Sequence, residues 1–457
     1  MDIARLNMNF PPLRQVLSCT DSASDHYALG AMYEQGQVAL RDYEKAAELY
    51  RSAADQGYAP AQYALGRVSS AGQGVPKNMG EAVNWYRSAA DQGYAPAQYA
   101  LGRMYVAGNG VPRDDAEAAK WMREAALQDH ADAQNELGVM YERGVGVVQN
   151  HVEAVTWYRK AADQHHAAAQ NNLGFMYERG RGVPQNDAEA VTWYRKAADQ
   201  DHAAAQNNLG FMYQCGRGLA RDEAEACKWI RRAADQGFAI AQNNLGFMYE
   251  RGRGVAQDFD KAAAWYRKAA EQGYAHAQNN LGVMYETGQG VAQDYTEARK
   301  WFRLAAEQCF AVAQYNLGVM CEHGQGGPKD LAEAHRWFDA AAEQHNASAQ
   351  FSLGVLYERG LGVTQDYAAA VSWYRVAADY GDPGAQLNLG VMYFYGRGVP
   401  QDYVEAHKWL NLAASRFPGS EAAKRAQAIR NRDVVARKMT RSQIAEAQRL
   451  AREWKAR

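Results

Sequence analysis

The chain has 457 residues, with 50 Lys and Arg against 52 Asp and Glu, so its formal net charge is −2 at pH 7. A charge this close to zero gives no overall electrostatic reason to bind nucleic acid or a membrane surface. The hydrophobic fraction of 47% and charged fraction of 22% are those of a folded protein and exclude a disordered chain.

The first 22 residues form an N-terminal extension that precedes the regular part of the chain. Arg5, Asn7 and Arg14 interrupt its apolar residues, so it lacks the hydrophobic core of a signal peptide. The run from Val16 to Cys19 resembles a lipoprotein cleavage site, but no hydrophobic segment precedes it. No other stretch has the length that a membrane span requires. We therefore expect a cytoplasmic protein.

Eleven Leu-Gly pairs follow at a spacing of 36 residues, from Leu29-Gly30 to Leu389-Gly390, without insertion or deletion. A fixed period of this length is typical of a repeat array, in which each unit buries its apolar face against its neighbours. The spacing predicts one continuous solenoid over residues 23–415 instead of the three domains that the length suggests. This architecture favours a binding function.

Each repeat is predicted to begin with a helix, called helix A below. In the repeat of Leu173, the apolar residues Ala169, Leu173, Met176 and Tyr177 have helical spacing. The Gly beside each Leu lacks a side chain, which allows another helix to approach closely. A second Gly stands seven residues after every Leu, where it suits a left-handed C-terminal cap.

A turn, usually Gly-x-Gly-Val, leads to the second predicted helix, called helix B. Asp or Asn stands thirteen residues after every Leu, as at Asn186, and is expected to cap helix B. Eight repeats add Glu three residues later, for example Glu81, which predicts a capping box. Helix B is expected to end at Gly or at a residue that tolerates positive φ, as at Asp129, His165 and Asp201.

Ten of the eleven tryptophans share one register of helix B, from Trp85 to Trp409. An aromatic stripe at a fixed register is typical of a hydrophobic core, and burial of each ring removes roughly 150–250 Å² from water. We therefore predict that this tryptophan ladder is the core of the solenoid.

Residues 416–457 are predicted to form C-terminal capping helices, one near 420–438 and one over 441–455. Thr440 would cap the last helix, with Gln443 completing a capping box. Residues 421–457 hold eleven Lys and Arg against four Asp and Glu. This segment is most simply a solvated pair of helices, and a contact with nucleic acid or acidic lipid is the alternative.

The repeat pattern A-x-x-x-L-G-x-M-Y-x-x-G-x-G-V…D-x-x-E-A-x-x-W-Y-x-x-A-A-x-Q-G resembles the Sel-1-like repeat, a relative of the tetratricopeptide repeat. The first repeat departs from it at Val38 and Leu49, as an end cap would, and the ninth has Gly327 in place of Val. The resemblance implies an all-α fold, a right-handed α/α superhelical solenoid. It also implies a bacterial adaptor or scaffold that binds another protein.

The sequence offers no clear catalytic or metal-binding pattern. Some cysteine-rich relatives have been linked to β-lactam hydrolysis, but Ser-x-x-Lys, Ser-Asp-Asn and Lys-Thr-Gly are missing from the sequence. The five cysteines are odd in number and stand at unrelated positions of the repeat, which favours reduced thiols. His130, His166 and His202 share one register, where other repeats carry aromatic residues such as Tyr58, so we interpret them as packing variants. We expect no enzyme activity, cofactor or metal.

A partner could lie on the face of helix A opposite its Leu, which lines the concave surface in related solenoids. Three sets of residues there are the predicted partner-binding residues: an asparagine ladder flanked by tyrosines, a phenylalanine stripe and an acidic rail. They are Asn135, Asn171, Asn207, Asn243, Asn279, Tyr63, Tyr99, Phe175, Phe211, Phe247, Glu178, Glu250 and Glu286.

Asn side chains offer a donor and an acceptor, so a ladder of them can hold the backbone of an extended chain. In the alternative interpretation, the Phe stripe packs between adjacent A helices and the Asn side chains are simply solvated. Our hypothesis is a non-enzymatic, monomeric scaffold that binds a polypeptide or extended peptide segment on its concave surface. An immunity or inhibitor protein that neutralises a secreted toxin is the first alternative, and a hydrolase is a disfavoured second.

Overall fold

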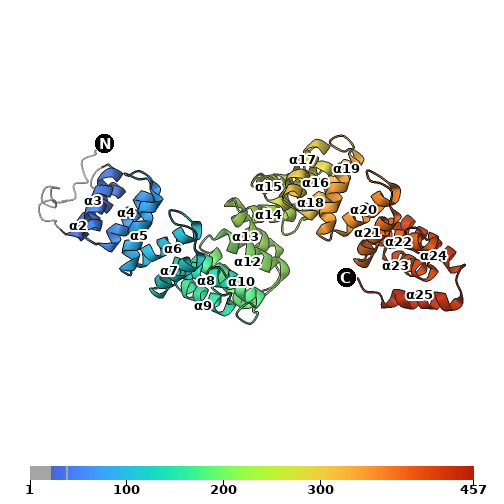
Figure 1. The fold of residues 1–457 in the computed structure, drawn as a ribbon, viewed down its shortest axis with the longest axis horizontal. Coiled ribbons are helices and arrows are strands. Elements are labelled where there is room, and N and C mark those ends of the chain that lie inside the picture. Colours follow the sequence, from blue (N-terminus) through green and yellow to red (C-terminus); the bar gives the residue numbers. More distant parts are fainter. Residues whose placement is uncertain (1–21, 38–39, 457) are drawn as a thin grey trace. The chain divides into compact units, whose positions relative to one another are not determined.

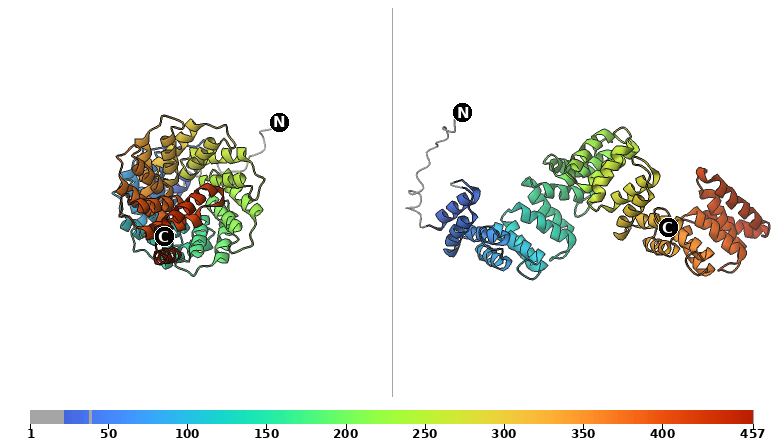
Figure 2. Two further views of the ribbon diagram at one scale, coloured as in Figure 1. Left: turned by 90° about the vertical axis from the view of Figure 1, so that its right-hand side faces the viewer. Right: turned by 90° about the horizontal axis from the view of Figure 1, so that it is seen from above.

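The computed structural model describes residues 22–37 and 40–456 (Figure 1). The backbone divides into two compact units, residues 1–222 and residues 223–457. The described residues form helices and loops without any strand (Figure 2). The all-α prediction is therefore confirmed. Most of the N-terminal extension, including Cys19, and the variant position Val38 lie outside the described residues.

The first unit contains eleven helices among the described residues. They are α2 (Ala23–Gln35), α3 (Tyr43–Asp55), α4 (Ala59–Ala71), α5 (Met79–Asp91), α6 (Ala95–Ala107), α7 (Asp115–Leu127), α8 (Ala131–Arg143), α9 (His151–Asp163), α10 (Ala167–Arg179), α11 (Asp187–Ala198) and α12 (Ala203–Cys215). Even-numbered labels are A helices and odd-numbered labels are B helices. Within this unit, each helix packs against the next one along the chain.

The second unit continues the alternation and ends with two further helices. They are α13 (Glu223–Asp235), α14 (Ala239–Arg251), α15 (Phe259–Glu271), α16 (Ala275–Thr287), α17 (Tyr295–Glu307), α18 (Ala311–His323), α19 (Leu331–Glu343), α20 (Ala347–Arg359), α21 (Tyr367–Asp379), α22 (Pro383–Tyr395), α23 (Tyr403–Arg416), α24 (Ala422–Ala436) and α25 (Arg441–Glu453). Both α24 and α25 pack against α23. The predicted capping box of Thr440 and Gln443 is present at α25.

The Leu-Gly pair locks helix A onto helix B of the same repeat. A Cβ atom added to Gly138 would lie 2.6 Å from the Tyr158 ring, and one added to Gly174 would lie 2.8 Å from the Tyr194 ring. Such separations are shorter than van der Waals contact, so only glycine fits there. The prediction that this glycine permits a close helix approach is confirmed.

The residue that follows Trp lies buried at the centre of each repeat, and it is aromatic in seven of the ten repeats that carry the Trp. Tyr158 and Tyr194 are fully buried, whereas Trp157 and Trp193 keep 6% and 7% exposure. Seven other ladder tryptophans are only half-buried: Trp85, Trp121, Trp229, Trp265, Trp301, Trp337 and Trp373. The prediction that the tryptophan ladder is itself the core was therefore wrong for these seven, whereas Trp157, Trp193 and Trp409 belong to the buried core. Helix B turns the residue after Trp toward the Leu-Gly pair.

The predicted caps are present, but the predicted capping box of helix B is not formed at Glu81. The Asn78 side chain accepts from the Glu81 N–H at 3.1 Å. The Asn78 N–H donates instead to the Ser69 carbonyl of helix A. The Glu81 carboxylate accepts from Arg51 at 2.8 Å and from the Trp85 indole. Because a carbonyl group of helix A already accepts from the Asn78 N–H, the Glu81 carboxylate binds side chains of helices α3 and α5 instead.

Residues with positive φ occur at the positions that the sequence predicted. The helix A cap Gly180 has φ 63°, and Asp129, His165 and Asp201 have φ near 60°. The second loop glycine has a further role, because a Cβ on Gly146 would lie 1.9 Å from the Asp115 carbonyl oxygen of the preceding helix B. This glycine therefore allows each loop to rest on the backbone of the previous repeat.

A buried glutamine that was not among the predicted features connects successive repeats. Gln134 is fully buried. Its Nε2 donates to the Ala126 carbonyl, at the end of the previous helix B, at 3.0 Å. Its Oε1 accepts from Gln164, at the end of its own helix B, at 2.8 Å. The signal was available, since Gln stands three residues before Leu in ten repeats.

Candidate functional site

All thirteen predicted partner-binding residues lie on A helices, some in the first unit and some in the second. Asn135 is on α8, Asn171 on α10 and Asn207 on α12, whereas Asn243 is on α14 and Asn279 on α16. Tyr63, Tyr99, Phe175, Phe211 and Glu178 belong to the first unit, and Phe247, Glu250 and Glu286 to the second. Within each unit the structure brings the asparagines into register.

The asparagine ladder accepts hydrogen bonds from a second row of asparagines on the neighbouring A helices. The Oδ1 of Asn135 accepts from the Nδ2 of Asn172 at 3.0 Å, and the Oδ1 of Asn171 accepts from Asn208 at 3.0 Å. Asn243 and Asn279 accept in the same way from Asn280 and Asn316 in the second unit. Asn135, Asn207 and Asn279 are also buried, at 7%, 8% and 7% exposure.

These hydrogen bonds change how the ladder should be interpreted. The acceptor oxygen that we assigned to a partner backbone already joins neighbouring A helices. The donor is the Asn one position before Leu, which the sequence analysis did not single out. Replacement of these asparagines would therefore weaken the stacking of repeats as well as any partner contact.

Two carboxylates of the acidic rail already accept hydrogen bonds within their own repeats. Glu178 accepts from the Tyr194 hydroxyl at 2.8 Å, and Glu250 accepts from the Tyr266 hydroxyl at 2.7 Å. Each tyrosine comes from helix B of the same repeat, and burial raises its pKa strongly. These carboxylates therefore satisfy the buried hydroxyls of the central tyrosines.

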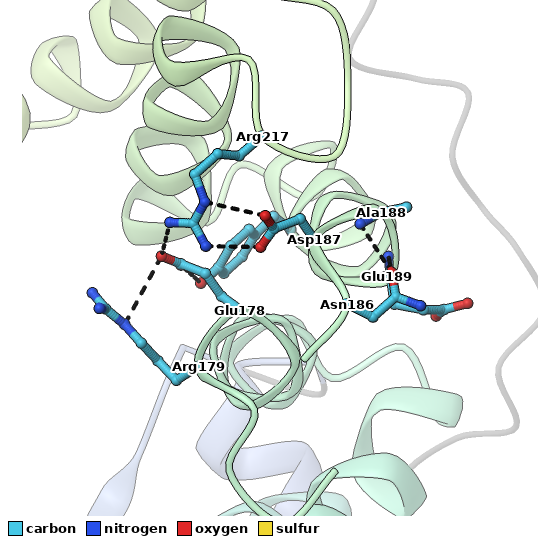
Figure 3. A network of polar contacts seen from close by, with 8 residues as sticks. Glu178, Arg179, Asn186, Asp187, Ala188, Glu189 and Arg217 are labelled. Atoms are coloured by element: carbon cyan, nitrogen blue, oxygen red, sulfur yellow. Dashed lines mark hydrogen bonds and ion pairs between the residues drawn. The ribbon is translucent and has the colours of Figure 1, made fainter. Parts of the chain in front are cut away.

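Glu178 is the centre of an ionic network that joins the fifth and sixth repeats (Figure 3). Only 7% of Glu178 is exposed. Arg217, in the loop after α12, donates to Glu178 at 3.0 Å. The same guanidinium donates to Asp187, at the start of α11, at 2.7 and 3.2 Å. This two-oxygen contact holds the Arg217 side chain against the preceding repeat.

Glu286 differs from the other two acidic residues. Helix B of its repeat carries Phe302 where Glu178 and Glu250 have a tyrosine partner. Burial raises the pKa of Glu286 above its ordinary value. The rail is therefore uneven, with a paired carboxylate at Glu178 and a half-buried one at Glu286.

The phenylalanine stripe is covered by arginines at two of its three positions. Arg179 and Arg181 lie 5.6 and 5.7 Å from the centre of the Phe175 ring. At Phe247 in the second unit, Arg251 and Arg253 lie at 5.7 and 5.3 Å. Guanidinium groups at this separation are attracted to the face of an aromatic ring.

Phe211 stands in a different environment. The position equivalent to Arg179 holds Cys215. The position equivalent to Arg181 holds Arg217, which the network of Figure 3 holds against Glu178 and Asp187. Phe211 is 43% exposed. The ionic network therefore leaves an aromatic ring open on helix α12.

The two predicted tyrosines pack against the starts of the following A helices. Tyr63 meets Tyr94 edge-on, with ring centres 5.7 Å apart, and Tyr99 stacks on His130 at 4.8 Å. Both tyrosines are half-buried. They widen the aromatic surface of the first unit.

The three histidines of the repeat register act as helix caps. The Nδ1 atoms of His130, His166 and His202 accept from the N–H groups of Ala133, Ala169 and Ala205. Desolvation lowers the pKa of His130 and His202, which favours the neutral ring that this hydrogen bond requires. Asn346 and Asp382 cap later A helices at the same register.

Three further findings concern the part of the chain that the structure describes. It holds no group of three or more His, Cys, Asp or Glu residues arranged to bind a metal. None of its helices combines the length and apolar character needed to cross a membrane. Its four cysteines are free, with Cys227 and Cys321 buried and Cys215 and Cys309 exposed.

Two-helix repeats stacked through their glycines, glutamines and asparagines define a solenoid repeat protein. The Sel1 repeat model matches eleven segments, at residues 23–58, 59–94, 95–130, 131–166, 167–202, 203–238, 239–274, 275–308, 311–346, 347–382 and 383–416. The chain belongs to the Sel1 repeat family. The Sel1 solenoid is a protein-interaction scaffold fold, and its members are generally non-enzymatic.

The chain is similar to solved structures of several bacterial proteins. The chain is 38% identical to c5321, a protective antigen of uropathogenic Escherichia coli strains, with a TM-score of 0.75 over 98% of this chain and 94% of that one. It is 36% identical to a Sel1 repeat protein of Oxalobacter formigenes, with a TM-score of 0.51 over 68% and 89% of the chains. The immunity protein Pa5087 of Pseudomonas aeruginosa is 23% identical, with a TM-score of 0.33 over 49% and 86% of the chains. The comparison with curated proteins found no match.

Proposed function

We propose that this protein is a non-enzymatic scaffold that binds an extended polypeptide along the face of its A helices. Phe211 is the observation that carries this proposal, since it is 43% exposed in a register where arginines cover the other two rings. An open aromatic ring on a rigid helix is typical of the few residues that dominate binding energy. The family's role as an interaction scaffold supports the same function.

The partner contacts the aromatic side chains more than the amide ladder. Phe211 and the half-buried Phe175 lie on neighbouring A helices, α12 and α10. Tyr63 and Tyr99 extend the aromatic surface toward the N-terminal repeats. The Oδ1 atoms of Asn135 and Asn171 are already used between repeats, so they add little binding energy.

Phe211→Ala is expected to weaken partner binding by about 30-fold or more. Removal of an aromatic ring that a bound partner buries typically costs at least about 2 kcal/mol of binding free energy. A partner is first captured on the immobilised full-length chain and identified by mass spectrometry. Its affinity for each variant is then measured by isothermal titration calorimetry. The stability of the chain should change little, because the ring is exposed.

Val152→Ala is the matched control, because Val152 is 61% exposed on helix B of the fourth repeat. It should leave the affinity unchanged. Wild-type affinity in the Phe211 variant, or an equal loss in both variants, would show that the A-helix face is not the binding site. The identity of the captured partner also distinguishes the two candidate functions, because a toxin would indicate an immunity or inhibitor protein.

A further inference from the structure

A cavity of about 560 Å³ opens at the C-terminal end of the second unit, within the range of ligand-binding pockets. It is called the terminal pocket here. Its apolar walls come from Phe351 and Val355 of α20, Leu387 of α22 and Phe417 at the end of α23. Residues of α24 close the remaining side. The first C-terminal helix therefore converts an open helix surface into a concave site.

The terminal pocket lies in the same registers as the partner-binding residues predicted from sequence. Phe351 stands two residues before Leu353, where the middle repeats carry the asparagine ladder. Gly384 makes room for it, because a Cβ there would lie 3.2 Å from the Phe351 ring. An aromatic wall thus replaces the amide contact at this end of the array.

The terminal pocket also contains a carboxylate with spare acceptor capacity. Asp382 caps α22, where its carboxylate accepts from the Ala385 N–H at 2.7 Å and from the Gly384 N–H. A carboxylate offers about four acceptor sites, so further donors can bind it. Desolvation raises the pKa of Asp382 in spite of nearby Lys424. Lys424 is itself paired with Glu421 at 3.1 Å.

We propose that the terminal pocket binds an arginine side chain of the extended polypeptide, which rests on the function proposed above. The guanidinium would donate to Asp382 and stack on the ring of Phe351 or Phe417, while the aliphatic stem packs on Leu387. Arginine fits better than lysine because its planar group combines two-point donation with stacking. Arg359 also lines the pocket, so the two-point contact with Asp382 must outweigh the repulsion between the two guanidinium groups.

The test uses Asp382→Asn in the full-length chain. Asparagine retains the cap, since Asn346 accepts from the Ala349 N–H at the same register of the previous repeat, so the variant removes the charge and leaves the helix start intact. The probe is fluorescein-labelled hexa-arginine, followed by fluorescence polarisation. We expect its Kd to rise at least tenfold in the variant. Hexa-citrulline, which has the same length without charge, should bind weakly to both proteins.

Glu136→Gln is the matched control, because it removes one exposed carboxylate from helix α8 of the first unit. It should leave hexa-arginine binding unchanged. Phe351→Leu keeps an apolar wall without an aromatic face and should raise the Kd by a smaller factor than Asp382→Asn. Free arginine amide should compete only weakly, which distinguishes a polypeptide ligand from a free metabolite.

Equal Kd values for Asp382→Asn and Glu136→Gln would overturn the terminal pocket as an arginine site, and so would equal affinity for hexa-citrulline. If Asp382→Asn has no effect while Phe211→Ala weakens the captured partner, the inference fails and the proposed function stands. If only Asp382→Asn has an effect, the pocket stands and the aromatic face of the first unit is not the site.

Discussion

Gly327→Val is expected to destabilise the second unit by about 1–3 kcal/mol, the usual cost of overpacking a filled site, although valine is the usual residue at this position of the repeat. A Cβ at residue 327 would lie 2.2 Å from Nη1 of Arg299. Arg299 is only 8% exposed, and its Nη2 donates to Glu333 at 2.9 Å and to the Cys321 sulfur at 3.2 Å. Valine would displace this guanidinium from Glu333 and the Cys321 sulfur, while Glu333 keeps its contact with Arg303 at 2.7 Å.

The control is the double variant Arg299→Val with Gly327→Val. Other repeats hold Val or Ala at the position of Arg299, for example Val155 and Val191, so the double variant restores the usual apolar contact. It should recover most of the lost stability. Urea unfolding followed by circular dichroism measures both variants. A wild-type midpoint for Gly327→Val alone would show that Gly327 and Arg299 are not coupled.

Tyr194→Ala is expected to cost about 3–5 kcal/mol, the usual cost of truncating a large buried aromatic side chain. The ring is fully buried and fills the space beside Gly174. Its hydroxyl donates to Glu178 at 2.8 Å, so the truncation also removes a partner of the network in Figure 3. Because each repeat contacts only its neighbours, the loss should be local.

Hydrogen exchange resolves this prediction by position. Amides of α10, α11 and α12 should exchange faster in Tyr194→Ala, while those of α4 and α5 keep their protection. Tyr194→Phe is the control, since Phe302 and Phe338 occupy the same register. It should cost only about 0.5–1.5 kcal/mol, the usual contribution of one hydrogen bond. Uniform loss of protection along the chain would contradict a local effect.

The features that the sequence predicted well are local ones. The capping residues act within one helix or one turn. The 36-residue period and the Leu-Gly pair are easy to recognise because they recur in every repeat. Thr440 and Gln443 form their box three residues apart, and Asp129 adopts positive φ at the predicted turn. Steric and hydrogen-bonding rules for neighbouring residues are sufficient to predict such features.

The features that only the tertiary structure decided are the partners of side chains distant in sequence. Glu178 meets Tyr194, which is 16 residues away, and Asn171 meets Asn208, which is 37 residues away. Arg217 pairs with Glu178 and Asp187, whereas the equivalent Arg181 covers Phe175. One polar group has several candidate partners on adjacent helices, and the sequence alone does not rank them. The packed geometry does, because burial makes an unpaired polar group costly and so selects the partner within reach.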